Sequence, residues 1–445
     1  MKNILIVIIT ISVTAVSAQD KIRTLNDCMK YAVENAARRN KQEARNNIGK
    51  YNYNEAVMRL LPSVGVRTSA YFNFGRGLDP ETNTYVNVNS FSNNYDIYTQ
   101  FTLFSGFSLI NKIRIEKMNV NSGKSRLKSE EDAIAYEVAE AYYNVLYFKG
   151  LLKYAEEQST ESENNLKRAE RMEELGLKGY PDVAEFRAKY ASDAYLAIKQ
   201  NNILKIGIII LKEKMNYPLD ETLEIADVDD SSTGMITEPV DDLISVYRSA
   251  LGFNPKAIAA ELSYKADVLN YKAEKGRLLP TLKGEAGVGT NFSRIMNSDP
   301  YKPFSEQFSG KRGSYVGFVL SVPIFNNFST NYEIKRKKQM MKISENEMTE
   351  TLRALYSDIE QAVTDMQGQA EQYKQAVEQI NAMKTAHSVN KLKYDEGLTS
   401  ALELTASANR LLNAQNEELG ARLQYLLKSR LVRYFKGESF IENNN

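Results

Sequence analysis

The spacing of apolar residues predicts two very long helices, one in each half of the chain. In the first half the seam residues alternate spacings of four and three: Ile134, Val138, Ala141, Val145, Phe148, Leu152 and Ala155. In the second half the series is Leu352, Leu355, Ile359, Ala362, Met366, Gln369, Tyr373, Ala376, Ile380, Met383, His387, Asn390, Tyr394 and Gly397. This is the repeat of a coiled coil. Many seam positions are small or polar, which favours helices in a shallow wall over a dense bundle.

The two helices are interrupted at matching places, by "LGLKGYP" at 175–181 and by "EGLTS" at 396–400. The glycines of the two breaks, Gly176 and Gly397, are 397 − 176 = 221 residues apart. Adding 221 to the first seam series gives positions of the second series, and the same shift carries Phe104 onto Phe325. The chain is therefore a tandem duplication.

Each break predicts the tip of a long antiparallel helical hairpin. Gly176 and Gly397 can take the left-handed conformation that ends a helix. Pro181 followed by Asp182 is typical of a helix start, with a proline in the first turn and a carboxylate near the positive end of the helix dipole. A helix over about 108–175 would be roughly 100 Å long, which exceeds any ordinary globular core.

Four segments instead alternate between apolar and polar residues, at about 64–75, 95–105, 282–292 and 314–325. Each has about ten residues, the length of a tilted membrane-spanning strand. The links between the paired segments are polar and rich in turn residues, as exterior loops would be. Alternation of this kind also occurs in the half-buried sheets of soluble proteins.

Four membrane strands would leave two open sheet edges, whose N–H and C=O groups lipid cannot satisfy. A barrel built from this chain must therefore close between copies. Two copies give eight strands, and side chains fill the interior of so small a barrel; three copies give twelve strands and leave a lumen. A pore therefore favours a trimer.

The first residues, MKNILIVIITISVTAVSAQD, indicate a secretory signal covering 1–18, with a lysine, an apolar run and small residues before the cut. The apolar run is too short for a spanning helix, and we expect no spanning helix elsewhere. Cys28 is the only cysteine, so it forms no internal disulfide and is interpreted as a small buried residue.

Composition argues against several other classes of protein. The 57 basic and 56 acidic residues leave a formal net charge of +1, which argues against a nucleic-acid-binding surface. Ten prolines and 23 glycines among 445 residues favour long regular elements.

Catalytic chemistry is not predicted either. His387 is the only histidine and occupies a seam position, where a packed or hydrogen-bonded side chain is expected rather than a metal ligand. The glycines of "GEAGVGTNF" lack the Lys and Ser/Thr of a phosphate-binding loop. We therefore predict no enzyme, no catalytic residue, no metal and no cofactor.

Three stretches resemble the TolC-type outer membrane efflux protein family, and the similarity covers nearly all of the mature chain. They are "GLTSALELTASANRLLNAQNEELGARLQYL" (397–426), which is similar to the family's helix after the second tip, "VGFVLSVPIFN" (316–326) and "EAYYNVLYFKGLLKYAEE" (140–157). The resemblance implies a homotrimer with a twelve-stranded β-barrel in the outer membrane and an α-barrel of twelve helices extending into the periplasm.

The resemblance also implies a function. Members of the family are passive exit ducts of tripartite efflux or type I secretion systems, docked at their helical tips to a periplasmic adaptor of an inner-membrane pump. By this resemblance the tip turns at Gly176, Leu177, Gly397 and Leu398 would contact the adaptor.

The family's tips also form its gate. Tyr394 lies at the position of a gate tyrosine, and Asp182 lies at that of the aspartate it bonds in the closed state. The position of the gate arginine is Thr399 here. Of the family's inner ring of two aspartates, only the first position is acidic, as Glu403, because the second is Ala406.

The expected fold is therefore mainly α with membrane β, built from two tandem repeats. After the signal peptide the first repeat covers 19–239, with its tip at about 176–181, and the second covers 240–445, with its tip at about 397–401. An equatorial belt is implied at about 217–240 and 436–445.

Two other functional classes are compatible with parts of this pattern. One is a structural or adaptor-like periplasmic coiled-coil protein, although an adaptor would carry one hairpin within soluble β-domains. The other is a stand-alone porin with no pump partner. Small drugs, metal ions and secreted polypeptides all remain open as cargo.

Overall fold

The computed structural model describes residues 23–78, 84–87, 89–227, 242–296 and 302–442. The expected signal peptide, together with the parts of the expected belt at 228–240 and 443–445, lies outside the described residues.

The chain folds into two compact units, and each unit draws on both halves of the sequence. The helical unit comprises Met1–Asn40, Ser129–Phe253 and Tyr356–Asn445, and the sheet unit comprises Lys41–Lys128 and Asn254–Leu355.

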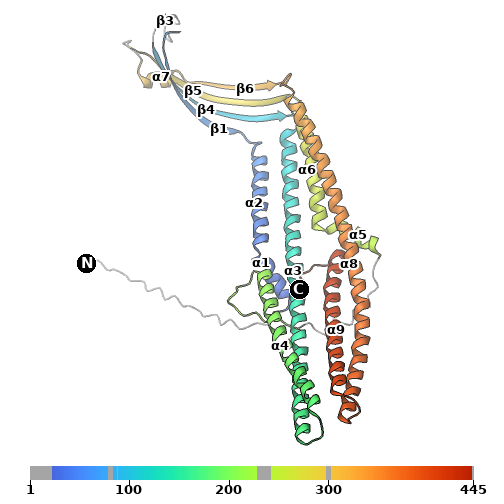
Figure 1. The fold of residues 1–445 in the computed structure, drawn as a ribbon. Helices are drawn as coiled ribbons and strands as arrows, with labels where there is room; N and C mark the ends of the chain where they lie inside the picture. Colours follow the sequence, from blue (N-terminus) through green and yellow to red (C-terminus); the bar gives the residue numbers. More distant parts are fainter. Residues whose placement is uncertain (1–22, 79–83, 88, 228–241, 297–301, 443–445) are drawn as a thin grey trace, which may run out of the picture. The chain divides into compact units, whose positions relative to one another are not determined.

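The sheet unit is built on a four-stranded antiparallel sheet in the order β1-β4-β5-β6 (Figure 1). Its strands are β1 (Ser63–Asn73), β4 (Ser90–Ser105), β5 (Thr281–Ile295) and β6 (Gly313–Ser321). Within the described residues, β1 and β6 each pair with one strand only, so the sheet has two open edges. The last strand ends before Pro323, which has no N–H to donate to a ladder; the expectation had extended it to about 325.

The register gives the sheet one apolar and one polar face. Val66 lies opposite Ile97, which lies opposite Val288. On the other face Arg67 lies opposite Asp96. The apolar face is exposed to solvent in the single chain. Val66 is 77% exposed, and other large apolar residues of β1 and β6 are exposed as well.

Two glycines of β5 are explained by close packing against aromatic rings. A Cβ at Gly287 would lie 2.6 Å from the Tyr315 ring, and one at Gly284 would lie 2.4 Å from the Phe101 ring. Aromatic rings of the neighbouring strands therefore lie across these glycines, and no phosphate site is needed to explain them.

Both segments expected as plain exterior loops contain short elements. The first holds a small hairpin, β2 (Arg76–Leu78) with β3 (Tyr85–Asn87), and the second holds the helix α7 (Phe304–Gly310). The Phe304 ring lies 5.5 Å from the Phe292 ring of β5. The buried Gln307 side chain exchanges hydrogen bonds with the backbone of Ser293 on β5. These contacts hold α7 on the sheet.

The helices lie in corresponding pairs along the chain. In the first repeat they are α1 (Leu25–Asn35), α2 (Ala37–Met58), α3 (Ser108–Glu174) and α4 (Tyr180–Met215). In the second they are α5 (Leu243–Phe253), α6 (Pro255–Gly276), α8 (Ser329–Asp395) and α9 (Ala401–Lys436). The helices α3 and α8 have 67 residues each, and α4 and α9 have 36 each, at a shift of 221. Two copies of one unit thus adopt the same secondary structure.

The coiled-coil seam is confirmed by burial. Every second-half seam position from Leu352 to Tyr394 is buried or half-buried, and Ile134 to Ala155 behave in the same way. Cys28 is wholly buried on α1, as expected, and burial raises the pKa of its thiol to about 12. The thiol is therefore protonated and unreactive at neutral pH.

The described parts of the expected belt pack against α1, α3 and α9 within the helical unit. Arg23 N–H donates to Glu224 O, and Ala226 N–H donates to Arg23 O, each at 3.0 Å. After α9 the chain turns at Gly437, and the buried Phe440 ring stacks on the Tyr434 ring at 4.4 Å.

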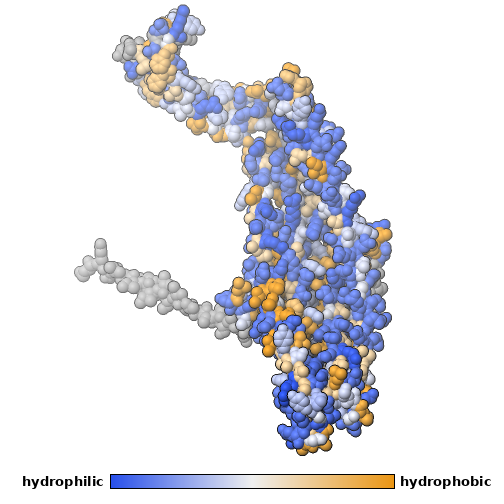
Figure 2. Space-filling model, in the orientation of Figure 1, coloured by the Kyte–Doolittle hydropathy of each residue, from blue (hydrophilic) through white to orange (hydrophobic). Residues whose placement is uncertain are grey.

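Of the described helices, α4 is long and apolar enough to cross a membrane, judged by length and composition alone. The apolar run at 206–211 raises its hydropathy, and one such helix is weak evidence of a span. Hydrophobic surface gathers over α4 in Figure 2. The exposed large apolar residues of α4 share one helical stripe and are Tyr180, Tyr195, Ile198, Ile206, Ile209 and Ile210.

Candidate functional site at the helical tips

The helical unit contains two hairpins, α3–α4 and α8–α9, whose tips lie at the same end of the unit (Figure 1). Gly176 and Gly397 both have φ of 72°. Leu177 N–H donates to Met172 O at 2.8 Å, and Gly176 N–H donates to Glu173 O at 2.8 Å, which is a Schellman motif. The second tip repeats it. The same backbone device therefore ends both long helices.

A Cβ at Gly176 would meet nothing within 4 Å, so an alanine there costs only backbone strain. We expect Gly176→Ala to destabilise the tip by about 1 kcal/mol, because a left-handed conformation disfavours a Cβ by roughly that amount. Gly176→Asn should cost less, since asparagine tolerates this conformation. Limited proteolysis at the tip would rank the two variants, and equal cleavage of both would contradict this account.

The helices that leave the tips each carry an acidic residue in the third position. Asp182 lies in the first turn of α4, and Glu403 occupies the equivalent position, 182 + 221 = 403, in α9. Ser400 Oγ accepts a hydrogen bond from Glu403 N–H at 3.3 Å. Both carboxylates lie where the helix dipole favours negative charge. The Glu403 carboxylate also pairs with Arg410 at 2.8 Å, which partly neutralises its charge.

The two hairpins meet in an apolar cluster just behind the tips, hereafter the tip cluster. The tip cluster consists of Leu166, Ala169, Val183, Phe186, Tyr394, Ala401 and Leu404, with Tyr190 packed against it. The Phe186 ring of α4 packs edge-on against the Tyr394 ring of α8, with centroids 5.4 Å apart. Contact between the hairpins at this level is therefore mainly apolar.

Tyr394 and Asp182 come close together without a direct bond. The Tyr394 hydroxyl oxygen is buried and has no hydrogen-bond partner among the described residues. Lys178 joins the two groups: its Nζ lies 4.5 Å from the Tyr394 ring centroid and 3.8 Å from Asp182 Oδ2. Burial, and then the Asp182 carboxylate, raise the pKa of Tyr394, so the phenol is neutral at physiological pH.

Two polar contacts also join the hairpins beside the tip cluster. Arg168 Nη1 of α3 lies 2.7 Å from Asp395 Oδ1 of α8. On the other side, Lys189 Nζ of α4 donates to Asn409 Oδ1 of α9 at 2.7 Å. Each long helix of one hairpin is thus connected to a helix of the other hairpin.

The ends of the tips are exposed. Leu177 is 67% exposed and Leu398 is 75% exposed, each at the residue after a tip glycine. Thr399 is half-buried beside the helix start at Ser400. Leu175 at the first tip and Leu402 at the second are also exposed, so each tip presents apolar side chains to a partner or to solvent.

Comparison with known proteins agrees with this architecture. Residues 246–433 match the model of the outer membrane efflux protein family. The outer membrane protein TolC of Escherichia coli is 21% identical over 440 residues, which cover 96% of this chain and 85% of TolC. Residues 246–433 thus belong to the outer membrane efflux protein family, and the similarity to TolC extends over nearly the whole chain.

Other relatives extend the agreement. The outer membrane efflux protein BepC of Brucella suis is 21% identical over 286 residues, covering 63% of this chain and 58% of BepC. The outer membrane protein VceC of Vibrio cholerae superposes with a TM-score of 0.77 at 13% identity, covering 94% of this chain and 96% of VceC. The fold is thus that of the family's channels, which are outer membrane proteins rather than enzymes.

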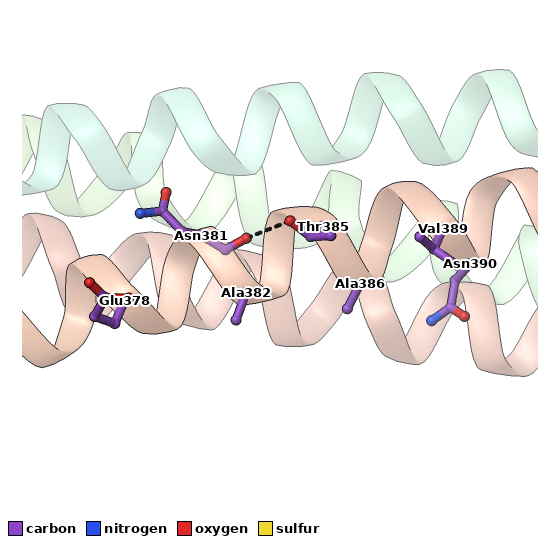
Figure 3. Close-up of a pocket in the computed structure, with 7 residues that line it drawn as sticks. All are labelled: Glu378, Asn381, Ala382, Thr385, Ala386, Val389 and Asn390. Atoms are coloured by element: carbon purple, nitrogen blue, oxygen red, sulfur yellow. Dashed lines mark hydrogen bonds between the residues drawn. The ribbon is translucent and has the colours of Figure 1, made fainter.

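One hollow on the described surface is lined by a single helix. A hollow of about 680 Å³ lies along one face of α8, and Figure 3 shows the side chains that line it. Seven residues of that single helix line it, among them Asn381, whose carbonyl accepts a hydrogen bond from Thr385 Oγ1 at 3.0 Å. The described residues contain no group of three or more His, Cys, Asp or Glu side chains that could hold a metal ion.

Several residues of the tip junction escaped the sequence analysis. Phe186, Lys178 and Arg168 gain their importance from which helices become neighbours, and no local motif marks them. One signal was available: the shift of 221 pairs Val183 with Leu404, and both lie in the tip cluster. Applying the shift of 221 residues to the apolar positions near both tips would have found part of the tip cluster.

Proposed function

We propose that this outer membrane efflux protein is a homotrimeric exit duct that opens by separation of its tip hairpins. A periplasmic adaptor, carrying an inner-membrane pump, would dock on two tip turns, one at Gly176 and Leu177 and the other at Gly397 and Leu398. Energy for export would come from the pump. The stand-alone porin is the alternative to this duct, and it differs in having no adaptor.

The main support for a trimer is the pair of open sheet edges at β1 and β6. The exposed face of the same sheet is apolar. In lipid each edge must find hydrogen-bond partners, and β1 of one copy can supply them to β6 of the next. Three copies give a barrel with a lumen, into which the polar face carrying Arg67 and Glu285 would point.

The exposed apolar stripe of α4 supports the same assembly. A single chain leaves Ile198, Ile206 and Ile209 uncovered. A helical wall completed by neighbouring copies would remove such a stripe from water, and each fully buried side chain of this size contributes about 1.5–3 kcal/mol.

The gate proposal rests on the tip cluster. Few residues hold the two hairpins together there, while α3 and α8 are long and continuous. Tyr394 would act through its ring, because its hydroxyl has no partner among the described residues, and Asp182 would act through Lys178. Thr399 and Glu403 would line the entrance beside them.

Native mass spectrometry of the detergent-extracted protein tests the assembly. Three chains per particle are expected, and a well-folded monomer would refute the duct. Pull-down from cross-linked membranes separates the two candidates, since an adaptor should be captured with the duct and not with a porin.

Conductance in planar bilayers tests the gate. The wild-type channel is expected to conduct poorly, and Tyr394→Ala and Asp182→Asn should each raise the open fraction. The alanine should have the larger effect because it removes a buried ring, whereas asparagine removes one half-exposed ion pair. Unchanged conductance in both variants would remove these residues from the gate.

A further inference from the structure

A buried polar pair lies two turns of α8 behind Tyr394. His387 Nδ1 is 3.0 Å from Ser407 Oγ of α9, and both side chains are buried. The equivalent positions in the first repeat, 387 − 221 = 166 and 407 − 221 = 186, are Leu166 and Phe186, which belong to the apolar tip cluster. Burying polar groups costs free energy that a leucine and a phenylalanine would not. Packing alone therefore does not account for His387.

The other nitrogen of the ring faces the opposite hairpin. His387 Nε2 lies 3.5 Å from Glu161 Oε1 of α3, and Lys391 Nζ lies 2.6 Å from the same oxygen. Glu161 is half-buried. His387, Lys391 and Glu161 thus join α8 to α3.

The hydrogen bonds constrain the protons on the ring. Ser407 Oγ donates its proton to Leu404 O at 2.8 Å, so it can only accept from His387, which places a proton on Nδ1. In the neutral ring Nε2 would then point a lone pair at a carboxylate. Protonation replaces this repulsion by a charge-assisted contact. The neutral ring avoids the repulsion only if the Ser407 hydroxyl turns away from Leu404 O.

Charged and polar groups on three helices surround this contact. On α3, Glu157 lines the same groove as Glu161 one turn earlier. On α8 the cations are Lys391 and Lys384, and on α9 the contact is the neutral Ser407, since Arg410 pairs with Glu403. Contact with His387, opposed by burial and aided by Lys391, lowers the pKa of Glu161 to about 2 from 4.5.

Because folding lowers the pKa of Glu161, its ionised carboxylate stabilises the fold at pH values above 4.5. This stabilisation is lost as the pH falls from 4.5 through about 2. Between about pH 5 and about pH 8, where histidine changes charge, Glu161 therefore stays ionised.

We propose that His387, Glu161 and Lys391 form a proton-responsive clasp that holds the α8–α9 hairpin on α3 more tightly in acid than in alkali. Its consequence for transport rests on the proposed gate: acidic pH would keep the tips closed, and neutral or alkaline pH would ease their separation. A leucine, as in the first repeat, would hold the hairpins without this response.

Distance measurements between the hairpins test the clasp without relying on transport. Spin labels at Lys167→Cys on α3 and Lys384→Cys on α8 report the separation, and both lysines are exposed. The buried Cys28 does not compete for label. From about pH 5.5 to about pH 8.5 the population with separated hairpins is expected to rise about fivefold, as for a partly exposed ion pair.

In His387→Gln the glutamine can still hydrogen-bond to Ser407 or Glu161 but does not titrate, so the pH response should vanish. Glu161→Gln should also abolish it, whereas Ser407→Ala should weaken it, because the neutral ring can then carry its proton on Nε2 and donate to Glu161. An unchanged response in His387→Gln, or none in the wild type, would overturn the clasp. A pH-dependent distance with pH-independent conductance would support the clasp and refute the proposed gate instead.

Discussion

Gly106→Ala is expected to prevent correct folding of the sheet unit. A Cβ at Gly106 would lie 1.9 Å from the Gly276 carbonyl oxygen, and one at Gly276 would lie 2.0 Å from the Gly106 carbonyl oxygen. At this point the backbone just after β4 packs directly against the backbone at the end of α6. Neither side can yield by rotating a side chain, so we expect a cost on the order of 4 kcal/mol, as for other changes that force the backbone to move.

The second repeat supplies a matched control for backbone conformation. Gly106 and Phe107 have positive φ, and so do Asn327 and Phe328 at the shift of 221. Asparagine is thus tolerated in this conformation at one junction. Gly106→Asn should nevertheless be as harmful as Gly106→Ala, because the clash with Gly276 remains. Asn327→Gly should change stability by less than about 1 kcal/mol.

Outer-membrane yield and thermal unfolding of the extracted protein would measure these effects. Gly368→Ala is a further control, since Gly368 lies within α8 and a Cβ there would meet nothing within 4 Å. This variant should be neutral or gain up to about 1 kcal/mol from helix propensity. Normal yield of Gly106→Ala would show that the two backbones do not need their close approach.

Phe186→Ala is expected to give the largest increase in conductance. Phe186 is almost fully buried in the tip cluster and packs against Tyr394, which belongs to the other hairpin. Removing a buried phenylalanine costs about 3–5 kcal/mol. Because the cluster joins the hairpins near their ends, most of that cost should appear as tip separation rather than as global unfolding.

Tyr394→Phe is the matched control for this effect. It keeps the ring on which Phe186 packs and removes a hydroxyl that has no hydrogen-bond partner within the described part of the chain. Its conductance should therefore stay close to that of the wild type. Planar bilayer recordings, with circular dichroism melts of the same samples, separate opening from unfolding. A closed Phe186→Ala channel, or an open Tyr394→Phe channel, would contradict a gate held by ring packing.

The sequence was most informative where structure depends on neighbours along the chain. The seam of α8 was predicted because helical periodicity places each apolar residue three or four positions from the next. The turns at Gly176 and Gly397 were predicted because a left-handed helix end needs glycine or asparagine locally. The duplication could be detected because both copies kept these local signals.

Elements that depend on distant contacts were not predicted. α7 lies on β5 because Phe304 meets Phe292 and Gln307 meets the backbone of Ser293, and nothing within α7 specifies those partners. β4 begins at Ser90, earlier than expected, because β5 on the other side extends to Ile295 and supplies its hydrogen bonds.

The repeated long helices, their tip turns and the alternating strands could thus be predicted from the amino-acid order, since each follows from local backbone preference and local burial pattern. The contacts of Phe186 with Tyr394, Gly106 with Gly276 and Glu161 with His387 became known from the folded chain. Such contacts depend on which helices and strands become neighbours, and that choice is made by packing over the whole of each unit.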